Sequence, residues 1–338
     1  MKQKIILLFL FLVLMISIPI LSKTINAKDT IKYMQDFSDR AAFWKKPRKE
    51  PTKSEFKVLD ESKDEILNIN VKDFLICSVA CEMDPDFEPE ALKAQAVAAY
   101  TYFKNLQQKQ KNKPTKELRG CDFAVNSENR IYYMTKEKLK ERWGEDFEKY
   151  YNKFEDLIDE VLGEYMQKDE QQYIEALYFS ISSGNTENIE DVFGGEKSYL
   201  ISVPSPYDTL APGYLTKKEV SLQEFKEKIG ESICRSIMGY SFDDLLGPIE
   251  RTKAGMVKAI QINKRSITGR EIRKIFDLRS ANFDIEQQND KIIFTVRGYG
   301  HGVGMSQYGA NEMAKQGADY HQILSWYYRG VNFAKDNV

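Results

Sequence analysis

One glutamate of the chain stands where a carboxyl group would lose its water. In the segment FLICSVACE, residues 74–82, Leu75, Ser78, Val79 and Glu82 are spaced at i, i+3, i+4 and i+7, so a helix would place Glu82 on its apolar stripe. Burial raises the pKa of a carboxyl group, which then holds a proton near neutral pH and can give it up. Glu82 is therefore a candidate general acid. The alternative is a glutamate at a helix end whose side chain reaches water.

A second candidate site is the glycine-rich stretch RGYGHGVGMSQYGA, residues 297–310, which contains His301, one of only two histidines. Its order, G-x-G-x-G-x-G, never gives G-x-G-x-x-G, and no Gly-Lys-Ser/Thr follows, so a nucleotide-binding loop is excluded. We expect a strand that ends in a turn and opens a helix, with His301, Ser306, Gln307 and Tyr308 facing a neutral polar ligand that approaches the bare backbone. The alternative is a tight strand-to-helix crossing with a buried histidine.

A third stretch, residues 178–208, changes from a strand-like run to small polar residues. Ser182, Ser183 and Thr186 suit either the binding of hydroxyl groups or turns with their own backbone.

Both helices and strands are needed to position these residues. Helix patterns cover residues 73–83, 89–107, 136–164, 306–316 and 320–329, and strand patterns cover residues 174–182, 256–264 and 290–298. The hydrophobic content of 42% is sufficient for a packed core. We predict an α+β fold, with mixed helices and antiparallel-rich strands in one large domain.

The N-terminus indicates export. Two lysines precede an uncharged apolar run over residues 5–21, and the nearest cleavage candidate, INA ending at Ala27, has a bulky residue at its outer position. We therefore expect an uncleaved membrane anchor over residues 1–27, a charged linker over 28–65 and the domain over 66–335.

The net charge of -2 argues against nucleic acid as a partner. The four cysteines have no framework spacing, and we expect buried thiols.

In these three stretches the chain resembles the stage II sporulation protein D family, which comprises peptidoglycan-cleaving proteins of endospore-forming bacteria. The matching segments are EMDPDFEPEALKAQAVAAYTY at 82–102, SISSGNT at 180–186 and GYGHGVGMSQYGA at 298–310, with TGREIRKIFDLRSANFDI at 268–285 in support. The resemblance covers residues 66 to the C-terminus.

The resemblance implies a lytic transglycosylase that acts on septal glycan strands during engulfment, outside the cytoplasm at the cell membrane. It implies a wall amidase and a membrane protein as partners, and no cofactor. Glu82 matches the catalytic glutamate of the family, and a transglycosylase needs no second carboxyl group. The implied substrate-binding residues are Lys93, Gln95, Ser183, His301, Ser306, Gln307 and Tyr308.

Three positions depart from the family pattern. Tyr100 stands where the family often has Arg, and Asn126 and Ser127 replace a His and a Cys that hold zinc in some members, so we expect no metal site. These departures leave open a glycan-binding scaffold with weak or no activity. A cysteine hydrolase using Cys81 and His301 is disfavoured, because Cys81 would point about 100° away from Glu82 around the helix.

Overall fold

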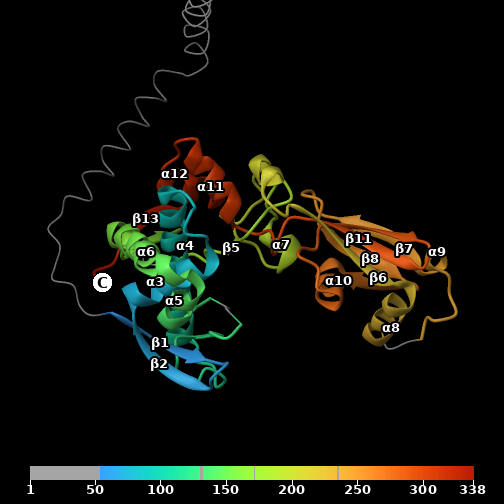
Figure 1. Ribbon diagram of the computed structural model, residues 1–338, viewed down its shortest axis with the longest axis horizontal. Coiled ribbons are helices and arrows are strands. Elements are labelled where there is room, and N and C mark those ends of the chain that lie inside the picture. Colours follow the sequence, from blue (N-terminus) through green and yellow to red (C-terminus); the bar gives the residue numbers. More distant parts are fainter. Residues whose placement is uncertain (1–53, 130–131, 171, 234–235) are drawn as a thin grey trace, which may run out of the picture. The chain divides into compact units, whose positions relative to one another are not determined.

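Helix α3, Val71–Glu82, carries the candidate acid Glu82 as its last residue (Figure 1). The computed structural model describes residues 54–129, 132–170, 172–233 and 236–338. Asn70 caps the helix by accepting a hydrogen bond from the backbone N–H of Lys72, and Met83 ends it with an extended backbone. Side chains from Val71 to Ala80 are nearly all buried, so the predicted apolar stripe belongs to a helix enclosed on most sides.

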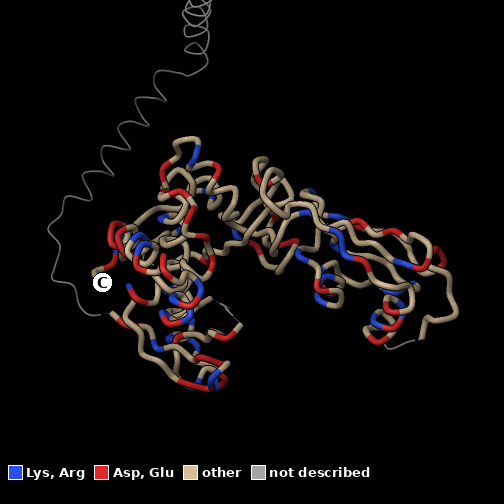
Figure 2. Tube along the Cα trace, in the orientation of Figure 1, with Lys and Arg blue, Asp and Glu red and all other residues tan. Residues whose placement is uncertain are grey.

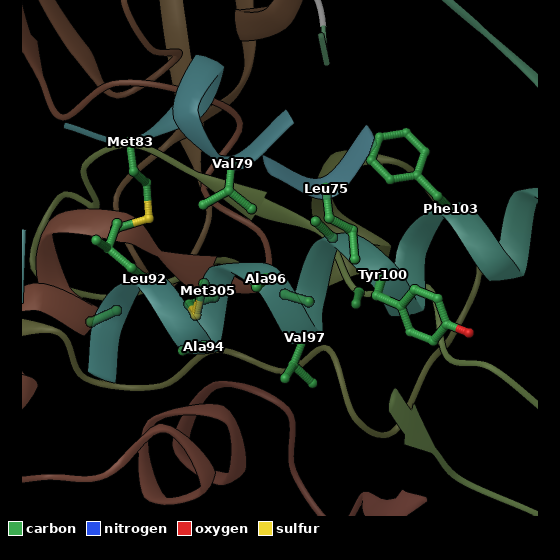
Figure 3. Close-up of a cluster of buried hydrophobic side chains, with 14 of the residues drawn as sticks. Leu75, Val79, Met83, Leu92, Ala94, Ala96, Val97, Tyr100, Phe103 and Met305 are labelled. Atoms are coloured by element: carbon green, nitrogen blue, oxygen red, sulfur yellow. The ribbon is translucent and has the colours of Figure 1, made fainter. Parts of the chain in front are cut away.

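Helix α4, Pro89–Asn112, packs along α3. Pro89 stands at the first helical position, where a missing N–H is not needed. Figure 3 shows Val79 and Met83 of α3 facing α4, with Leu92 of α4 opposite Met83. The predicted helix over 89–107 is confirmed and continues farther, because the polar residues that follow extend it into solvent.

Two helices replace the single helix expected over residues 136–164. They are α5, Lys136–Trp143, which Thr135 caps as predicted, and α6, Phe147–Val161. Gly144 adopts a φ of +54°, which a right-handed helix does not allow, and a short 3₁₀ turn over Gly144–Asp146 joins the two.

Strand β1, Glu55–Asp60, is the centre of a three-stranded sheet. It pairs antiparallel with β2, Glu65–Asn70, and parallel with β3, Phe123–Val125. Phe56 and Val58 of β1 are buried, while Glu55 and Lys57 are exposed. This strand lies in the segment expected as a linker over 28–65. The folded part therefore begins earlier than predicted, because alternating apolar residues were hidden among many charges.

A second hydrophobic core forms around Phe225, Phe276 and Phe294. Two antiparallel sheets, β10-β11-β6 and β7-β8-β9, supply most of it. The predicted strands over 256–264 and 290–298 are confirmed as β8 and β11. The elements around this core are β6 (Leu215–Ser221), α8 (Leu222–Ser232), α9 (Phe242–Leu245), β7 (Leu246–Arg251), β8 (Val257–Ile262), β9 (Arg265–Thr268), α10 (Gly269–Phe276), β10 (Phe283–Gln288) and β11 (Lys291–Arg297).

Short strand pairs join segments that are far apart in the sequence. Strand β5, Tyr178–Phe179, pairs parallel with β12, Met305–Ser306, and thereby places the segment before SSGNT beside the glycine-rich turn. The expected strand over 174–182 is thus confirmed only in part. The remaining elements are β4 (Glu164–Gln167), which pairs antiparallel with β13 (Asn332–Lys335), the short helices α7 (Ile189–Val192) and η2 (Pro206–Leu210), and the predicted C-terminal helices α11 (Gln307–Lys315) and α12 (Tyr320–Tyr327).

Helices and antiparallel sheets together confirm the α+β class, and the described residues up to Asp336 form one compact unit. Basic and acidic residues are intermixed along the chain (Figure 2). The expected membrane helix over 1–27 and Cys234 lie outside the described residues. Within the described ranges, no helix combines the length and the apolar character needed to cross a membrane.

Candidate active site

The side chains of Glu82 and Gln307 meet where the end of α3 faces the start of α11. Burial raises the pKa of Glu82 to about 7, and the nearby Gln307 side chain opposes this rise, although Gln307 Nε2 forms no hydrogen bond with any described residue. Gln307 itself is only 4% exposed, so bulk water does not surround its amide group. Glu82 therefore holds a proton over much of the neutral range, as its place on the buried stripe predicted.

Electrostatically, Glu82 stands apart from the other charged groups of the described chain. Burial and Gln307 account for the shift in its pKa, and no Asp, Glu, Lys or Arg among the described residues adds to it. A second carboxylate close by would raise the pKa further, and a cation would lower it. The site thus presents one carboxyl group without a charged assistant.

Tyr178 of β5 is a neighbour of Glu82 that the sequence did not single out. Its hydroxyl is buried and has no hydrogen-bond partner among the described residues. Burial raises the pKa of Tyr178 well above its usual value, and the negative charge of Glu82 raises it further. The ring lies 6.4 Å from that of Tyr102, measured between centroids. Tyr178 is therefore a neutral donor whose hydroxyl is not used by the fold.

The start of α11 is fixed by a second buried carboxyl group, Asp208. Ser306 accepts a hydrogen bond from the Gly309 N–H as the cap of α11, and its hydroxyl donates to Asp208 Oδ1 at 2.8 Å. Burial raises the pKa of Asp208, and hydrogen bonds from serines oppose that rise. Ser306 thus positions Gln307 through the helix that it caps. Asp208 was missed because a lone Asp in a turn carries no distinguishing pattern.

The loop between α3 and α4 is held against α11. The Glu88 N–H donates to Asn311 Oδ1 at 2.8 Å, and the Phe87 ring meets Tyr308 edge-on at 5.0 Å between centroids. Tyr308 therefore lies beside the loop that follows Glu82 and donates its backbone N–H to Ser180.

The alternating glycines have a different use from the expected approach of a sugar. All four have positive φ, and each faces the segment that runs from Leu177 to Glu187. A Cβ atom at Gly304 would lie 2.0 Å from the Leu177 carbonyl oxygen, and one at Gly302 would lie 2.9 Å from Glu187 Cγ. The bare backbone is thus required by a neighbouring segment of the protein itself, as in the tight crossing considered above.

His301 serves the same crossing. The Val303 N–H donates to His301 Nδ1 at 3.1 Å, and the imidazole also hydrogen-bonds the backbone carbonyl of Tyr178. Burial, together with the positive charges of Arg273 and Arg270, lowers the pKa of His301 to about 4. The ring is a neutral group with two backbone partners, and its contact with a substrate stays a prediction.

Three other predicted residues form no hydrogen bond or ion pair with Glu82 or Gln307 in the described part of the chain. Lys93 forms ion pairs with Glu90 and Glu160, with an Nζ–Oε1 distance of 3.0 Å to Glu90. Ser183 donates to the Ala254 carbonyl at 3.3 Å. Gln95 is fully buried, and both polar atoms of its amide lack a partner among the described residues.

Two of the residues that depart from the family pattern, Ser127 and Tyr100, form hydrogen bonds within the protein. Ser127 donates its hydroxyl to Asp60, and Ser62 donates to the same carboxylate at 2.6 Å, which ties the β1–β2 turn to the segment after β3. The hydroxyl of Tyr100 donates to Asp336 Oδ2 at 2.6 Å. An Arg at position 100 would therefore face Asp336. In the described part of the chain, no cluster of His, Cys, Asp and Glu could hold a metal ion.

Fold and site together define an α+β protein in which the Glu82 carboxyl group, with its raised pKa, lies near the helix that follows a glycine-rich strand-to-helix crossing. Residues 60–167 match the family model described as stage II sporulation protein (SpoIID). The chain is 36% identical over 275 residues to stage II sporulation protein D of Bacillus amyloliquefaciens, covering 81% of this chain and 77% of that relative. It is also 36% identical over 269 residues to stage II sporulation protein D of Bacillus subtilis, covering 79% and 75%.

The chain belongs to the stage II sporulation protein D family, and thus to a group of sporulation proteins. A shorter similarity of 32% identity over 84 residues, 24% of this chain, relates it to the amidase enhancer of Bacillus subtilis, of which it covers 12%.

Proposed function

We propose that this protein is a peptidoglycan lytic transglycosylase in which Glu82 is the only group that transfers protons. The observation that carries the proposal is the burial of the Glu82 carboxyl group, which raises its pKa to about 7 and keeps a large fraction protonated at neutral pH.

In the first step, protonated Glu82 gives its proton to the oxygen that links muramic acid C1 to the next sugar. The C1–O bond breaks as positive charge develops on the muramic acid ring. In the second step, the C6 hydroxyl of the same muramic acid attacks C1, and the Glu82 carboxylate accepts the hydroxyl proton. One C–O bond is broken and one is formed, no water is consumed, and Glu82 ends protonated again.

This mechanism requires one carboxyl group, whereas a hydrolase needs a second one to position water or to attack C1. The isolation of Glu82 from other charges among the described residues supports the one-carboxylate pathway. Gln307 and Tyr178 are suited to orient Glu82, because the Gln307 side chain and the Tyr178 hydroxyl are buried and neither carries a charge.

For the cellular setting, we propose that the apolar run over 5–21 anchors the chain in the cell membrane with the folded part outside the cytoplasm. The glycan strands of the septal wall would be the substrate during engulfment. The partial similarity to an amidase enhancer supports a wall amidase as a partner, together with a membrane protein of the engulfment machinery.

The decisive experiment is mass spectrometry of fragments that the purified full-length protein releases from peptide-free glycan. We expect 1,6-anhydromuramic acid ends. Reducing muramic acid ends would indicate hydrolysis and contradict the mechanism. Binding without any release would indicate the alternative, a glycan-binding scaffold.

A further inference from the structure

A cavity of about 690 Å³ lies apart from Glu82, between α7, β8 and α10. Its lining includes the basic residues Lys258, Arg270, Arg273 and Lys274 and the acidic residues Asp191, Glu271 and Asp277. A volume of this size accommodates a small ligand such as one or two sugars. Because the lining carries both charges, the ligand that fits depends on which of these groups already have a partner in the protein.

Two of the acidic groups already have partners. Asp191 forms an ion pair with Lys258 at 3.2 Å, and Glu271 accepts hydrogen bonds from the Thr268 backbone and hydroxyl in the capping box of α10. The arginines of the lining differ, because neither Arg270 nor Arg273 forms an ion pair with any described residue.

Each of these arginines is held in place by a backbone carbonyl and keeps other donors available. Arg270 donates to the Val192 carbonyl at 2.6 Å, and Arg273 donates through Nε to the Leu278 carbonyl at 3.1 Å. A guanidinium group has five N–H donors, so several remain for a ligand. The two cations are close enough to repel each other, and this repulsion adds to the burial that lowers the pKa of Arg273.

A third arginine, Arg279, forms no ion pair with any described residue and follows the cavity-lining Leu278 in sequence; it lies over Tyr299, which also influences the pKa of Arg273. Its Nε atom is buried and has no hydrogen-bond partner within the described chain. Its guanidinium lies 4.2 Å from the centre of the Tyr299 ring, and that of Arg270 lies 4.8 Å from the centre of the Phe193 ring. We call Arg270, Arg273 and Arg279 the arginine cluster.

The two rings beside the arginine cluster are unusually accessible. Phe193 and Tyr299 are each 45% exposed, although they flank buried segments of the chain. An exposed aromatic face packs well against the C–H face of a sugar ring, and the adjacent guanidinium suits an acidic substituent on that sugar. Rings and cations together favour an acidic carbohydrate over a purely apolar or purely ionic ligand.

We propose that the cavity and the arginine cluster bind the carboxylate-bearing muramic acid of a glycan strand, as a subsite additional to that of Glu82. The inference rests on the proposed function, because it takes the substrate to be peptidoglycan. The carboxylate is supplied either by the lactyl group of muramic acid or by the peptide attached to it.

The acidic residues of the lining favour this ligand over a polyanion. A chain of phosphates would meet the carboxylates of Asp191, Glu271 and Asp277 at every unit, whereas a sugar with one carboxylate offers hydroxyl donors to these oxygens. The subsite also connects to the active site. The charges of Arg270 and Arg273 lower the pKa of His301, and His301 hydrogen-bonds the backbone of Tyr178. Tyr178 is in turn the residue whose hydroxyl lies near Glu82.

The test is a binding titration with the full-length protein in detergent, carrying Glu82→Gln so that glycan is not consumed. The probes are peptide-free glycan strands, the same strands with their carboxyl groups reduced to alcohols, peptide-bearing strands, and poly(glycerol phosphate). The added variants are Arg270→Gln and Arg279→Gln. The matched control is Arg265→Gln, an exposed arginine on β9 outside the cavity lining.

We expect peptide-free glycan to bind at least about tenfold more tightly than its carboxyl-reduced form, the usual effect of a charge-assisted hydrogen bond. The Arg270→Gln and Arg279→Gln changes should each remove most of this difference, and Arg265→Gln should preserve it. Tighter binding of peptide-free than of peptide-bearing strands assigns the lactyl carboxylate, and the reverse order assigns the peptide.

Equal affinity for carboxyl-reduced, peptide-free and peptide-bearing strands would overturn the proposal, as would an equal loss in Arg265→Gln. Displacement of glycan by poly(glycerol phosphate) at the same charge concentration would instead indicate a general polyanion site and also overturn it. Failure of the proposed function is a separate result. A wild-type protein that discriminates between the two glycans but releases no anhydro ends keeps the subsite and loses the enzyme.

Discussion

The Gln307 side chain lies close enough to Glu82 to lower the pKa of its carboxyl group, so that the first residue of α11 and the last residue of α3 share one site. Asp208 and Ser306 fix α11, and Asn311 fixes the loop that follows Glu82. The geometry of the candidate acid therefore depends on the buried groups Asp208, Ser306 and Asn311 as well as on its own helix.

Glu82→Gln should lower the release of glycan fragments by about 10²- to 10⁴-fold, the usual contribution of general acid–base catalysis. The amide keeps the shape of the side chain but cannot exchange the proton, so glycan binding should survive. Fragment release is measured by mass spectrometry, with glycan pull-down for binding. Asp84→Asn is the matched control, because Asp84 is exposed and its amide can still accept from the Asp86 N–H. Near-normal turnover by Glu82→Gln would remove Glu82 from the mechanism.

The pH dependence of kcat/KM should show an alkaline limb near pH 7, because Glu82 must be protonated in the first step and its pKa is raised to about 7. Gln307→Leu should move this limb to higher pH, since Gln307 stabilises the charged form of Glu82 and lowers its pKa. The rate at low pH should fall as well, because the acid is less well oriented. A limb that stays at the same pH in the variant would contradict the assigned contact.

Stability provides an independent measure of the same pKa. The folded pKa of about 7 lies above the ordinary value of 4.5, so the contribution of Glu82 is fully present below pH 4.5 and is lost as the pH rises through 7. This amounts to about 3 kcal/mol at most. Glu82→Gln should therefore raise the free energy of unfolding relative to wild type at pH 8 and leave it nearly unchanged at pH 4. Denaturant titrations at both pH values test this, and parallel pH curves for the two proteins would refute it.

Tyr178→Phe should reduce fragment release without destabilising the fold. The hydroxyl has no partner among the described residues, so its removal relieves an unsatisfied buried group and should leave the melting temperature unchanged or higher. Tyr102→Phe is the control, because the Tyr102 hydroxyl hydrogen-bonds Tyr132 in the same ring cluster and its loss should lower stability. If Tyr178→Phe lowered stability with full activity, the hydroxyl would belong to the fold.

The sequence was most informative where a pattern is local. The 3.6-residue period placed Glu82, which is half-buried at the end of α3, on the same face as the buried Leu75 and Val79, and the glycine order excluded a nucleotide loop. Neighbours of Glu82 that come close only through tertiary contacts could not be predicted from the sequence. Nothing in the spacing shows that Tyr178 turns toward Glu82, because that depends on the pairing of β5 with β12. Strand β1 was hidden for a similar reason, since Phe56 and Val58 are too few to distinguish a strand from a charged linker.

The glycine-rich turn shows the same limit and yields the last prediction. A positive φ was to be expected at such glycines, but the sequence does not tell whether a ligand or another segment of the protein approaches them. Gly304 and Gly317 have similar φ values, +81° and +91°, and differ in their surroundings. A Cβ atom at Gly304 would lie 2.0 Å from the Leu177 carbonyl oxygen, whereas one at Gly317 would meet nothing within 4 Å.

Gly317→Ala should therefore cost only the backbone strain of a left-handed residue, about 1–2 kcal/mol. Gly304→Ala adds a clash with fixed backbone and should cost well above 3 kcal/mol or prevent folding. Thermal unfolding of both variants, followed by circular dichroism, separates these outcomes. If Gly304→Ala unfolded at the same temperature as Gly317→Ala and lost only glycan binding, the turn would approach substrate and not the 177–187 segment.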